Sequence, residues 1–326
     1  MYTVAVTGIT GKSGQYFLKR LLKEKAKLKD YEFILLCRND KIASKNNKGY
    51  QLIEKALKDN DLNVKTYDID LTNVEGLKTF FKEQYIDMLL HIAGIKLSKY
   101  VVPAALRSGV DNYILVHTTG IYSKYKAAGE EYRQIESRIN KLVEKYNKRD
   151  RKVAMTILRP TMIYGDLNDK NVATFIKMVD KLRIFPTVNG ARYDLQPVWC
   201  KDLGDAYYDV MMKWDIASFK KILSRDKEYI LSGKEPIQLR KMFEVMAKQL
   251  GVKNLFISCP YPIAYAGACL IYALTFRKID YREKVQRLVE PRAYSHHKAT
   301  EDFGYNPVAF EDGVRKEIQE YKLNKI

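Results

Sequence analysis

The chain has 326 residues, which is enough for one large or two modest domains and for a core that folds unaided. It carries 57 Lys and Arg against 39 Asp and Glu, a formal net charge of +18. The cations are dispersed and no zinc-finger or RNA-binding signature accompanies them, so the charge favours a solvated lysine-rich surface over nucleic-acid binding.

The first expected element is a strand over Tyr2–Val6, which leads into the stretch VAVTGITGKSGQ. Its GKS resembles the end of an ATP-binding P-loop, but that motif needs a glycine at position 6, where the chain has Val6. A strand, a glycine turn and a helix with an apolar face instead predict a dinucleotide-binding turn, where amides at the helix start hold phosphates. The turn comprises Gly8, Gly11, Lys12, Ser13 and Gly14.

Strand-like and helix-like segments then alternate, which is typical of a parallel sheet covered by helices on both faces. Helices are expected at Leu77–Gln84 and Ile135–Tyr146. Ligands bind beyond the carboxyl ends of the strands in such sheets, and glycines and polar residues gather there in this chain. Further strands are expected at Phe33–Cys37, Val64–Tyr67, Met88–His91, Tyr113–His117 and Ala154–Leu158.

Seven motifs occur in the order in which they stand in a known superfamily: TGITGKSG, YDIDL, HIAG, HTTGIYS, LRPTMIYG, QPVWCKDLGDA and YILSGKEPIQLRKMFEVMAKQLG. Over nearly its whole length the chain thus resembles the extended, epimerase/dehydratase-like branch of the short-chain dehydrogenase/reductase superfamily. The resemblance implies an α/β fold, a doubly wound parallel Rossmann sheet with a smaller, mostly C-terminal substrate domain. Residues 1–165 with 194–232 would bind NAD(P), and residues 166–193 with 233–326 would bind substrate.

The same resemblance implies a cofactor site and places Asp70 near the adenine ring. Arg38 directly follows the second expected strand, where an acidic residue would bind the ribose diol of NAD. A guanidinium suits a 2′-phosphate instead, and Lys12 in the phosphate turn points the same way, so we expect NADP(H) rather than NAD(H). The other expected cofactor contacts are Gly8, Gly11, Ser13, Gly14, Leu71, Ala93, Gly94, Thr118 and Pro160.

Catalysis in the superfamily uses a Ser or Thr that orients substrate and a Tyr whose pKa is lowered by a Lys four residues on. The motif match places Thr118 and Tyr132 in these roles, but the residue four after Tyr132 is Glu136. A carboxylate raises the pKa of a nearby phenol. Tyr122 and Lys126 also have the Tyr-to-Lys spacing, although they lie only a few residues after Thr118.

Two functions therefore stay open. Thr118 and Tyr132 favour an NADP(H)-dependent oxidoreductase or epimerase that acts on a carbonyl or sugar-nucleotide substrate, with Arg192 as a contact to the substrate diphosphate. Glu136 favours a non-catalytic or weakly catalytic NADP(H)-binding protein that senses redox state or assists assembly. In both cases we expect a small-molecule ligand and no nucleic acid, and a homodimer is left open.

The segment Asn254–Phe276 contains no charged residue. Pro260 and Pro262 interrupt it and leave a helical part, Ile263–Phe276, that is shorter than the ~20 apolar residues a bilayer span requires. We expect a buried helix of the substrate domain and no stable membrane insertion. The alternative is a membrane-surface element beside a lipid-linked substrate.

The four cysteines, Cys37, Cys200, Cys259 and Cys269, lack metal-ligand spacing. This favours a reduced, cytoplasmic protein without a metal site. An apolar strand-like run begins within three residues of Met1, so we expect no signal peptide.

Overall fold

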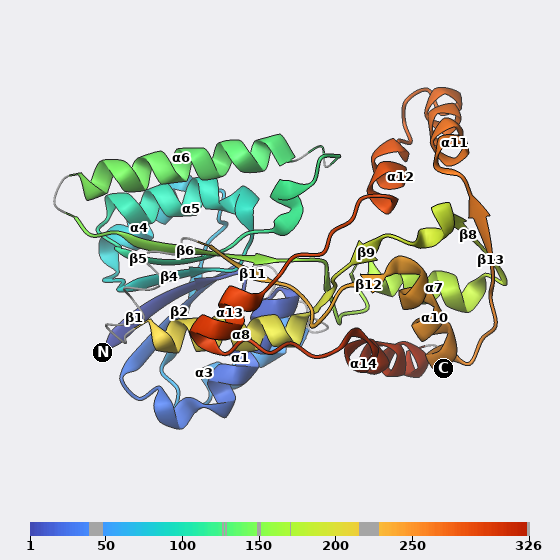
Figure 1. The fold of residues 1–326 in the computed structure, drawn as a ribbon. Helices are drawn as coiled ribbons and strands as arrows, with labels where there is room; N and C mark the ends of the chain where they lie inside the picture. Colours follow the sequence, from blue (N-terminus) through green and yellow to red (C-terminus); the bar gives the residue numbers. More distant parts are fainter. Residues whose placement is uncertain are drawn as a thin grey trace.

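Seven parallel strands form the central sheet, in the order β11-β6-β5-β4-β1-β2-β3 (Figure 1). The computed structural model describes residues 1–38, 48–125, 127, 129–148, 151–169, 171–214 and 228–324. The strands are β1 (Tyr2–Thr7), β2 (Tyr31–Cys37), β3 (Val64–Asp68), β4 (Met88–His91), β5 (Asn112–Val116), β6 (Ala154–Pro160) and β11 (Glu228–Leu231). The expected doubly wound α/β sheet is confirmed.

Helices cover both faces of this sheet (Figure 1). One face carries α4 (Val74–Glu83), α5 (Ile95–Arg107) and α6 (Gly129–Asn147), and the other carries α1 (Lys12–Lys23), α3 (Lys48–Leu57), α8 (Cys200–Lys213) and α13 (His297–Phe303). Strands such as β1 and β4 are apolar and buried because both of their faces pack against helices. The chain reverses its direction of winding between β1 and β4, and this is where ligands bind in such sheets.

The helices on each face of the sheet form one apolar core with it, and a third apolar core lies beyond the carboxyl edge of the sheet. Within it the rings of Phe185 and Phe243 lie 4.6 Å apart. Tyr164 and Trp199 belong to the same core, although the expected domain boundaries assign both to the nucleotide-binding part. The expected boundaries between the nucleotide-binding and substrate-binding parts therefore stay a prediction. The elements of this region include α7 (Val172–Lys181), β8 (Ile184–Val188), α10 (Leu239–Leu250), β13 (Leu255–Cys259) and α14 (Phe310–Leu323).

Several short elements complete the fold, and all but η1, which lies between α1 and β2, stand between the sheet and this third core. Three are 3₁₀ turns, and the strands pair as β7 with β10 and β9 with β12. They are η1 (Lys25–Lys27), η2 (Thr119–Tyr122), η3 (Asn189–Ala191), β7 (Ile163–Tyr164), β9 (Asp194–Leu195), β10 (Val198–Trp199) and β12 (Ile237–Gln238).

The helix α11 (Tyr261–Leu274) projects from the molecule next to α12 (Arg282–Leu288) (Figure 1). The expectation that it is buried is wrong: Ala268 is the one buried residue of the helix, whereas Leu274 is 69% exposed. Apolar composition predicts burial only where a partner face exists, and the described part of the chain provides none for most of α11. None of the described helices is long and apolar enough to cross a membrane.

Candidate functional site

The glycine turn between β1 and α1 has the conformation that its sequence predicts. Gly8 has a φ of +76°, and a Cβ there would lie 2.5 Å from the backbone nitrogen of Ala93. A Cβ on Gly14 would collide with the carbonyl oxygen of Gly8, so both positions require glycine. No side chain caps α1 after Gly11, which suits a helix start that receives phosphate. Ser13 is buried, and its hydroxyl lies 3.3 Å from the hydroxyl of Tyr207.

A cavity of about 450 Å³ opens beside this turn, and we call it the Arg38 cavity. Asp70 accepts hydrogen bonds from the backbone nitrogen and hydroxyl of Thr72, and a third from Arg38 at 3.2 Å. The hydroxyl of Thr72 is the main cause that lowers the pKa of Asp70, so this carboxylate is charged. The cavity is lined by Gly8, Thr10, Leu36, Cys37, Arg38, Tyr50, Ile69, Asp70, Leu71, Thr72, Ala93 and Leu97.

A second cavity of about 400 Å³, the Thr118 cavity, lies where β5 and β6 end. Thr118 caps η2, and its hydroxyl oxygen accepts from the nitrogen of Gly120 at 2.9 Å. The hydroxyl of Thr119 donates to the carbonyl of Pro160. The cavity is lined by Lys12, Thr118, Thr119, Gly120, Ser123, Thr161, Met162, Ile163, Asn171, Leu195, Gln196, Arg287, Arg292 and Tyr294.

The segment 287–294 closes one side of the Thr118 cavity and is fixed by polar contacts. The hydroxyl of Ser123 donates to the carboxylate of Glu290 at 2.6 Å, and the backbone nitrogen of Lys124 donates to the same carboxylate at 2.8 Å. The nitrogen of Tyr294 donates to the side-chain oxygen of Gln196 at 2.9 Å. These bonds hold a segment from late in the chain against the strand ends of the sheet.

Two guanidinium groups of this segment line the cavity with donors that lack acceptors. The Nε atoms of Arg287 and Arg292 are buried and have no hydrogen-bond partner. Burial, and then the charge of Arg287, lower the pKa of Arg292 to about 10. Buried donors without acceptors are costly, and a diphosphate or carboxylate would satisfy them. The pair therefore forms a candidate anion site.

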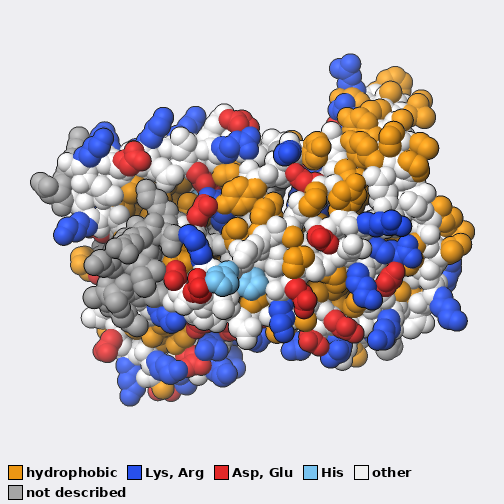
Figure 2. All heavy atoms as spheres, in the orientation of Figure 1, with side chains coloured by type: hydrophobic (Ala, Val, Ile, Leu, Met, Phe, Trp, Pro, Cys, Tyr) orange, Lys and Arg blue, Asp and Glu red, His pale blue; other side chains and the backbone are white. Residues whose placement is uncertain are grey.

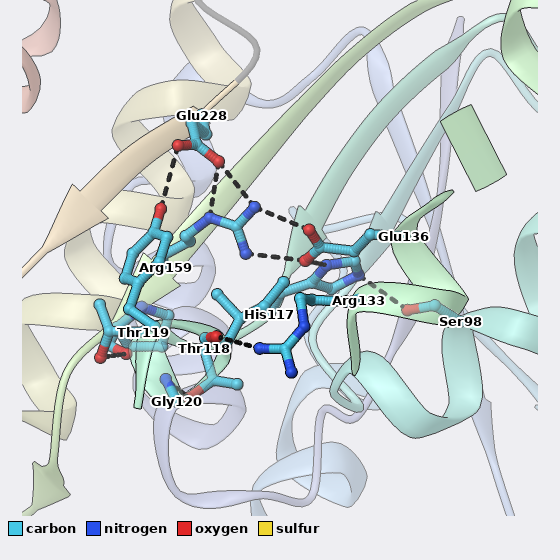
Figure 3. Close-up of polar contacts among 12 residues, drawn as sticks. Ser98, His117, Thr118, Thr119, Gly120, Arg133, Glu136, Arg159 and Glu228 are labelled. Atoms are coloured by element: carbon cyan, nitrogen blue, oxygen red, sulfur yellow. Dashed lines mark hydrogen bonds and ion pairs between the residues drawn. The ribbon is translucent and has the colours of Figure 1, made fainter. Parts of the chain in front are cut away.

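Figure 3 shows a buried polar network beside Thr118. Arg159 binds the two carboxylate oxygens of Glu136 at 2.7 and 2.8 Å, and its Nε donates to Glu228 at 2.7 Å. Nδ1 of His117 lies 2.7 Å from Glu136, and its Nε2 lies 3.0 Å from the hydroxyl of Ser98. The network joins α5, α6, β6, β11 and the residue that follows β5, at the carboxyl edge of the sheet.

The charges within this network are set by burial and by its hydrogen bonds. Burial alone would raise the pKa of Glu136, but the bonds from His117 and Arg159 hold it at about 2. Burial lowers the pKa of His117, so the imidazole is neutral. Because the carboxylate only accepts, Nδ1 carries the proton and Nε2 accepts from Ser98. Glu136 is thus an ion-pair partner of Arg159.

Tyr132 lies outside both cavities. It is 9% exposed and packs with Ile135 and Ile139 in the core between the sheet and α5 and α6. Its catalytic role stays a prediction that this placement does not support. Lys126, the lysine of the alternative pair, lies outside the described residues. Tyr122 of that pair donates its hydroxyl to Glu228.

The expected cofactor residues divide between the two cavities. Gly8, Arg38, Asp70, Leu71 and Ala93 line the Arg38 cavity. Lys12 lines the Thr118 cavity instead. The two cations expected to bind a 2′-phosphate together, Lys12 and Arg38, therefore line different cavities. The remaining expected residues shape the backbone around the cavities: Gly11, Ser13, Gly14, Gly94 and Pro160.

Arg192, the expected diphosphate contact, lies in a third cavity with Arg240 and Glu244. The structure brings Arg292 and Arg287 to Thr118 instead. Arg292 belongs to the stretch EPRAYS, but nothing local in the sequence marks it as a neighbour of Thr118. Within the described ranges, no group of three or more metal-ligating side chains occurs.

Comparison with known proteins places this geometry in context. A family model for GDP-mannose 4,6 dehydratase matches residues 5–110. A dTDP-glucose 4,6-dehydratase from Bacillus anthracis, solved with NAD, superposes with a TM-score of 0.68 at 14% identity, covering 99% of this chain and 97% of the other. No curated protein sequence matches the chain.

Two sugar-nucleotide epimerases superpose similarly. A UDP-glucose 4-epimerase from Thermotoga maritima, solved with UDP-glucose, has a TM-score of 0.66 at 16% identity, covering 99% of this chain and 100% of the other. A UDP-glucuronic acid 4-epimerase from Bacillus cereus, solved with UDP-glucuronic acid and NAD, has a TM-score of 0.66 at 16% identity, covering 98% and 99%. The chain therefore shares the fold of these epimerases and of the dehydratase.

Proposed function

We propose that this protein is a pyridine-nucleotide-dependent oxidoreductase or epimerase that acts on a sugar nucleotide. One observation carries the proposal: a dinucleotide turn with its own cavity stands beside the Thr118 cavity, which is lined by two arginines whose Nε atoms are buried and have no hydrogen-bond partner. The superposed epimerases and dehydratase, which were solved with NAD or UDP-sugars, support it.

The residues present fit such a cofactor. The glycine turn leaves no space for a Cβ at Gly8 or Gly14, and the uncapped start of α1 offers backbone amides to a pyrophosphate. A bound nicotinamide would supply the hydride chemistry. The hydroxyl of Thr118 would orient a substrate hydroxyl, while Arg287 and Arg292 would hold the substrate diphosphate.

Arg38 supports a preference for NADP(H). Its guanidinium lies in the Arg38 cavity and is partly exposed, with one ion pair to Asp70 at 3.2 Å. A charge-assisted bond to a 2′-phosphate contributes ~1.5–3 kcal/mol, or roughly ten- to a hundredfold in affinity. We expect NADPH to bind more tightly than NADH by about this factor in fluorescence titrations, and Arg38→Asp to remove the preference.

Lys12 provides the matched control for this titration. Because it lines the other cavity, Lys12→Ala should weaken both nucleotides alike and leave their ratio unchanged. Equal affinity of the unmodified protein for NADPH and NADH would refute the preference. A lost preference in Lys12→Ala alone would transfer the role from Arg38 to Lys12.

The diphosphate site can be tested with UDP as the probe in calorimetry. Arg292→Ala should reduce UDP affinity by roughly ten- to a hundredfold, since it removes a charged hydrogen-bond donor from the site. Arg192→Ala is the matched control and should leave UDP affinity unchanged, because Arg192 lies in a different cavity. If Arg192→Ala lowered UDP affinity and Arg292→Ala did not, Arg192 would be the diphosphate contact, as the sequence predicts.

A nucleotide-binding protein with little catalysis is the second candidate. The placement of Tyr132 in the core and the ion pair between Glu136 and Arg159 favour it, because the Tyr–Lys pair of the superfamily is not assembled from these positions. Calorimetry and a turnover assay together separate the two candidates. Tight binding of NADPH without binding of UDP, or binding of both without turnover of a UDP-sugar, would identify the second candidate.

A further inference from the structure

The exposed side of α11 forms an apolar surface that the proposed function does not use. We define the α11 surface as Ile263, Leu270, Ile271, Leu274 and Phe276, whose exposed fractions are 63%, 59%, 40%, 69% and 87%. Ile263, Leu270 and Leu274 follow helical spacing and share one face. Figure 2 shows hydrophobic side chains gathered on this projecting part of the molecule. Surfaces of this kind mark interaction sites.

The apolar surface continues below the helix. The strands β8 and β13 pair so that Ile184 stands opposite Leu255, and these side chains are 58% and 63% exposed. Pro260 alone separates β13 from α11, so helix and strand pair belong to one stretch of chain. An exposed apolar strand pair beside an exposed apolar helix indicates a broad partner surface rather than a narrow groove.

Charge identifies the partner. No Asp or Glu occurs between positions 254 and 279, and the segment 277–284 that follows α11 carries four cations and two carboxylates. Arg277 and Lys278 are exposed directly beside Phe276. An apolar helix with cations at its end matches the boundary of a bilayer that contains anionic lipids.

Tyrosines surround the same surface. Tyr261 and Tyr265 stack with ring centroids 5.7 Å apart, and Arg282 lies over the ring of Tyr272 at 3.9 Å. Tyrosine rings are enriched at the level of lipid headgroups because one end is apolar and the other polar. Four features therefore coincide on α11: exposed apolar side chains, absent carboxylates, terminal cations and flanking tyrosines.

A second copy of the chain fits less well. A two-fold dimer places the same patch against itself, which brings the net positive segments 277–284 of both copies into one interface. We propose that the α11 surface docks on an anionic membrane, with α11 lying in the interface plane. The length of α11, 14 residues, agrees with a helix that lies on a bilayer and does not span one.

Vesicle sedimentation of the full chain tests this proposal. The protein should sediment with vesicles of mixed phosphatidylcholine and phosphatidylglycerol and remain in solution with phosphatidylcholine alone. Leu270→Glu and Phe276→Glu should each lower vesicle affinity at least about tenfold, because each replaces an exposed apolar side chain that would enter the bilayer by a charge that anionic lipids repel. Arg277→Glu should weaken binding most at low salt.

Leu323→Glu is the matched control, because Leu323 is 74% exposed on α14, outside the α11 surface. It should bind vesicles like the unmodified protein. Failure of the unmodified protein to bind anionic vesicles would overturn the proposal, as would equal loss in Leu323→Glu. A dimer in light scattering that Leu270→Glu dissociates, without vesicle binding, would assign the surface to a second copy instead.

Discussion

Glu136 is the residue that most clearly separates this chain from the catalytic pattern it resembles. The resemblance implies a lysine at this position, one helical turn from Tyr132, but Glu136 is 8% exposed and points to Arg159 and His117 (Figure 3). Its two carboxylate oxygens satisfy a guanidinium and an imidazole at once. The glutamate therefore has a structural role of its own, in which it joins α6 to β6 and to the residue that follows β5.

Replacing Glu136 by lysine should accordingly destabilise the protein instead of restoring catalysis. The variant would bury an ammonium beside Arg159, and breaking a buried ion pair costs about 3–5 kcal/mol. We expect Glu136→Lys to lower the free energy of unfolding in urea by at least that amount. Glu136→Gln, which keeps the shape and removes the charge, should lose less.

Glu144→Lys serves as the control on the same helix, because Glu144 is exposed two turns along α6. It should change the free energy of unfolding by less than about 0.5 kcal/mol. If Glu136→Lys left the free energy of unfolding unchanged, or bound the nucleotide more tightly than the unmodified protein, the structural role of Glu136 would be refuted. Position 136 would then correspond to the catalytic lysine position of the superfamily.

Elements of the sheet could be predicted from the sequence because their local pattern and their environment agree. Each expected strand lies within two residues of an observed one. For the central strands β1, β4 and β5 this is because continuous apolar runs fit strands that are buried on both faces. The prediction that α11 is buried is wrong because its local pattern and its environment disagree. The local sequence shows that the segment is apolar, but it does not show whether another element covers the helix.

The candidate site divides in the same way. The glycine turn, Asp70 and Thr118 each carry a short motif next to a strand, so the sequence predicts them. Arg292 and the Glu136–Arg159 pair depend on contacts between distant segments: Arg292 stands 174 positions after Thr118, and Arg159 stands 23 after Glu136. Arginine occurs often enough that no local signal distinguishes Arg292 from Arg192.

At the scale of the whole molecule, a buried carboxyl pair joins the C-terminal helix to the strand ends. Glu317 of α14 is 2% exposed and accepts a hydrogen bond from the nitrogen of Gly165 at 3.2 Å. Asp169, also buried, accepts from the nitrogen of Ala173 at the start of α7. Burial, and then the charge of Asp169, raise the pKa of Glu317 far above its usual value. The folded protein therefore holds a proton on Glu317 at neutral pH.

This proton makes stability depend on pH in a defined direction. The unfolded chain releases the proton near pH 4.5, whereas the folded protein keeps it, so folding takes up a proton at any pH between these two pKa values. The contribution of Glu317 to stability is complete below about pH 4.5 and declines as pH rises, by at most ~1.4 kcal/mol per pH unit. Urea unfolding measured between pH 5 and 8 should show this decline.

Glu317→Gln isolates the effect, because glutamine keeps the size of the side chain and cannot ionise. The stability of the unmodified protein relative to Glu317→Gln should fall steadily from pH 5 to 8. Glu311→Gln, an exposed substitution on the same helix, should instead leave the pH dependence of the unmodified protein unchanged. Parallel curves for the unmodified protein and Glu317→Gln would mean that Glu317 is ionised in the folded state. In that case a charged carboxylate would stand between α14 and the loop after β7, and Lys12, whose charge lowers the pKa of Glu317, would be the cation that stabilises it.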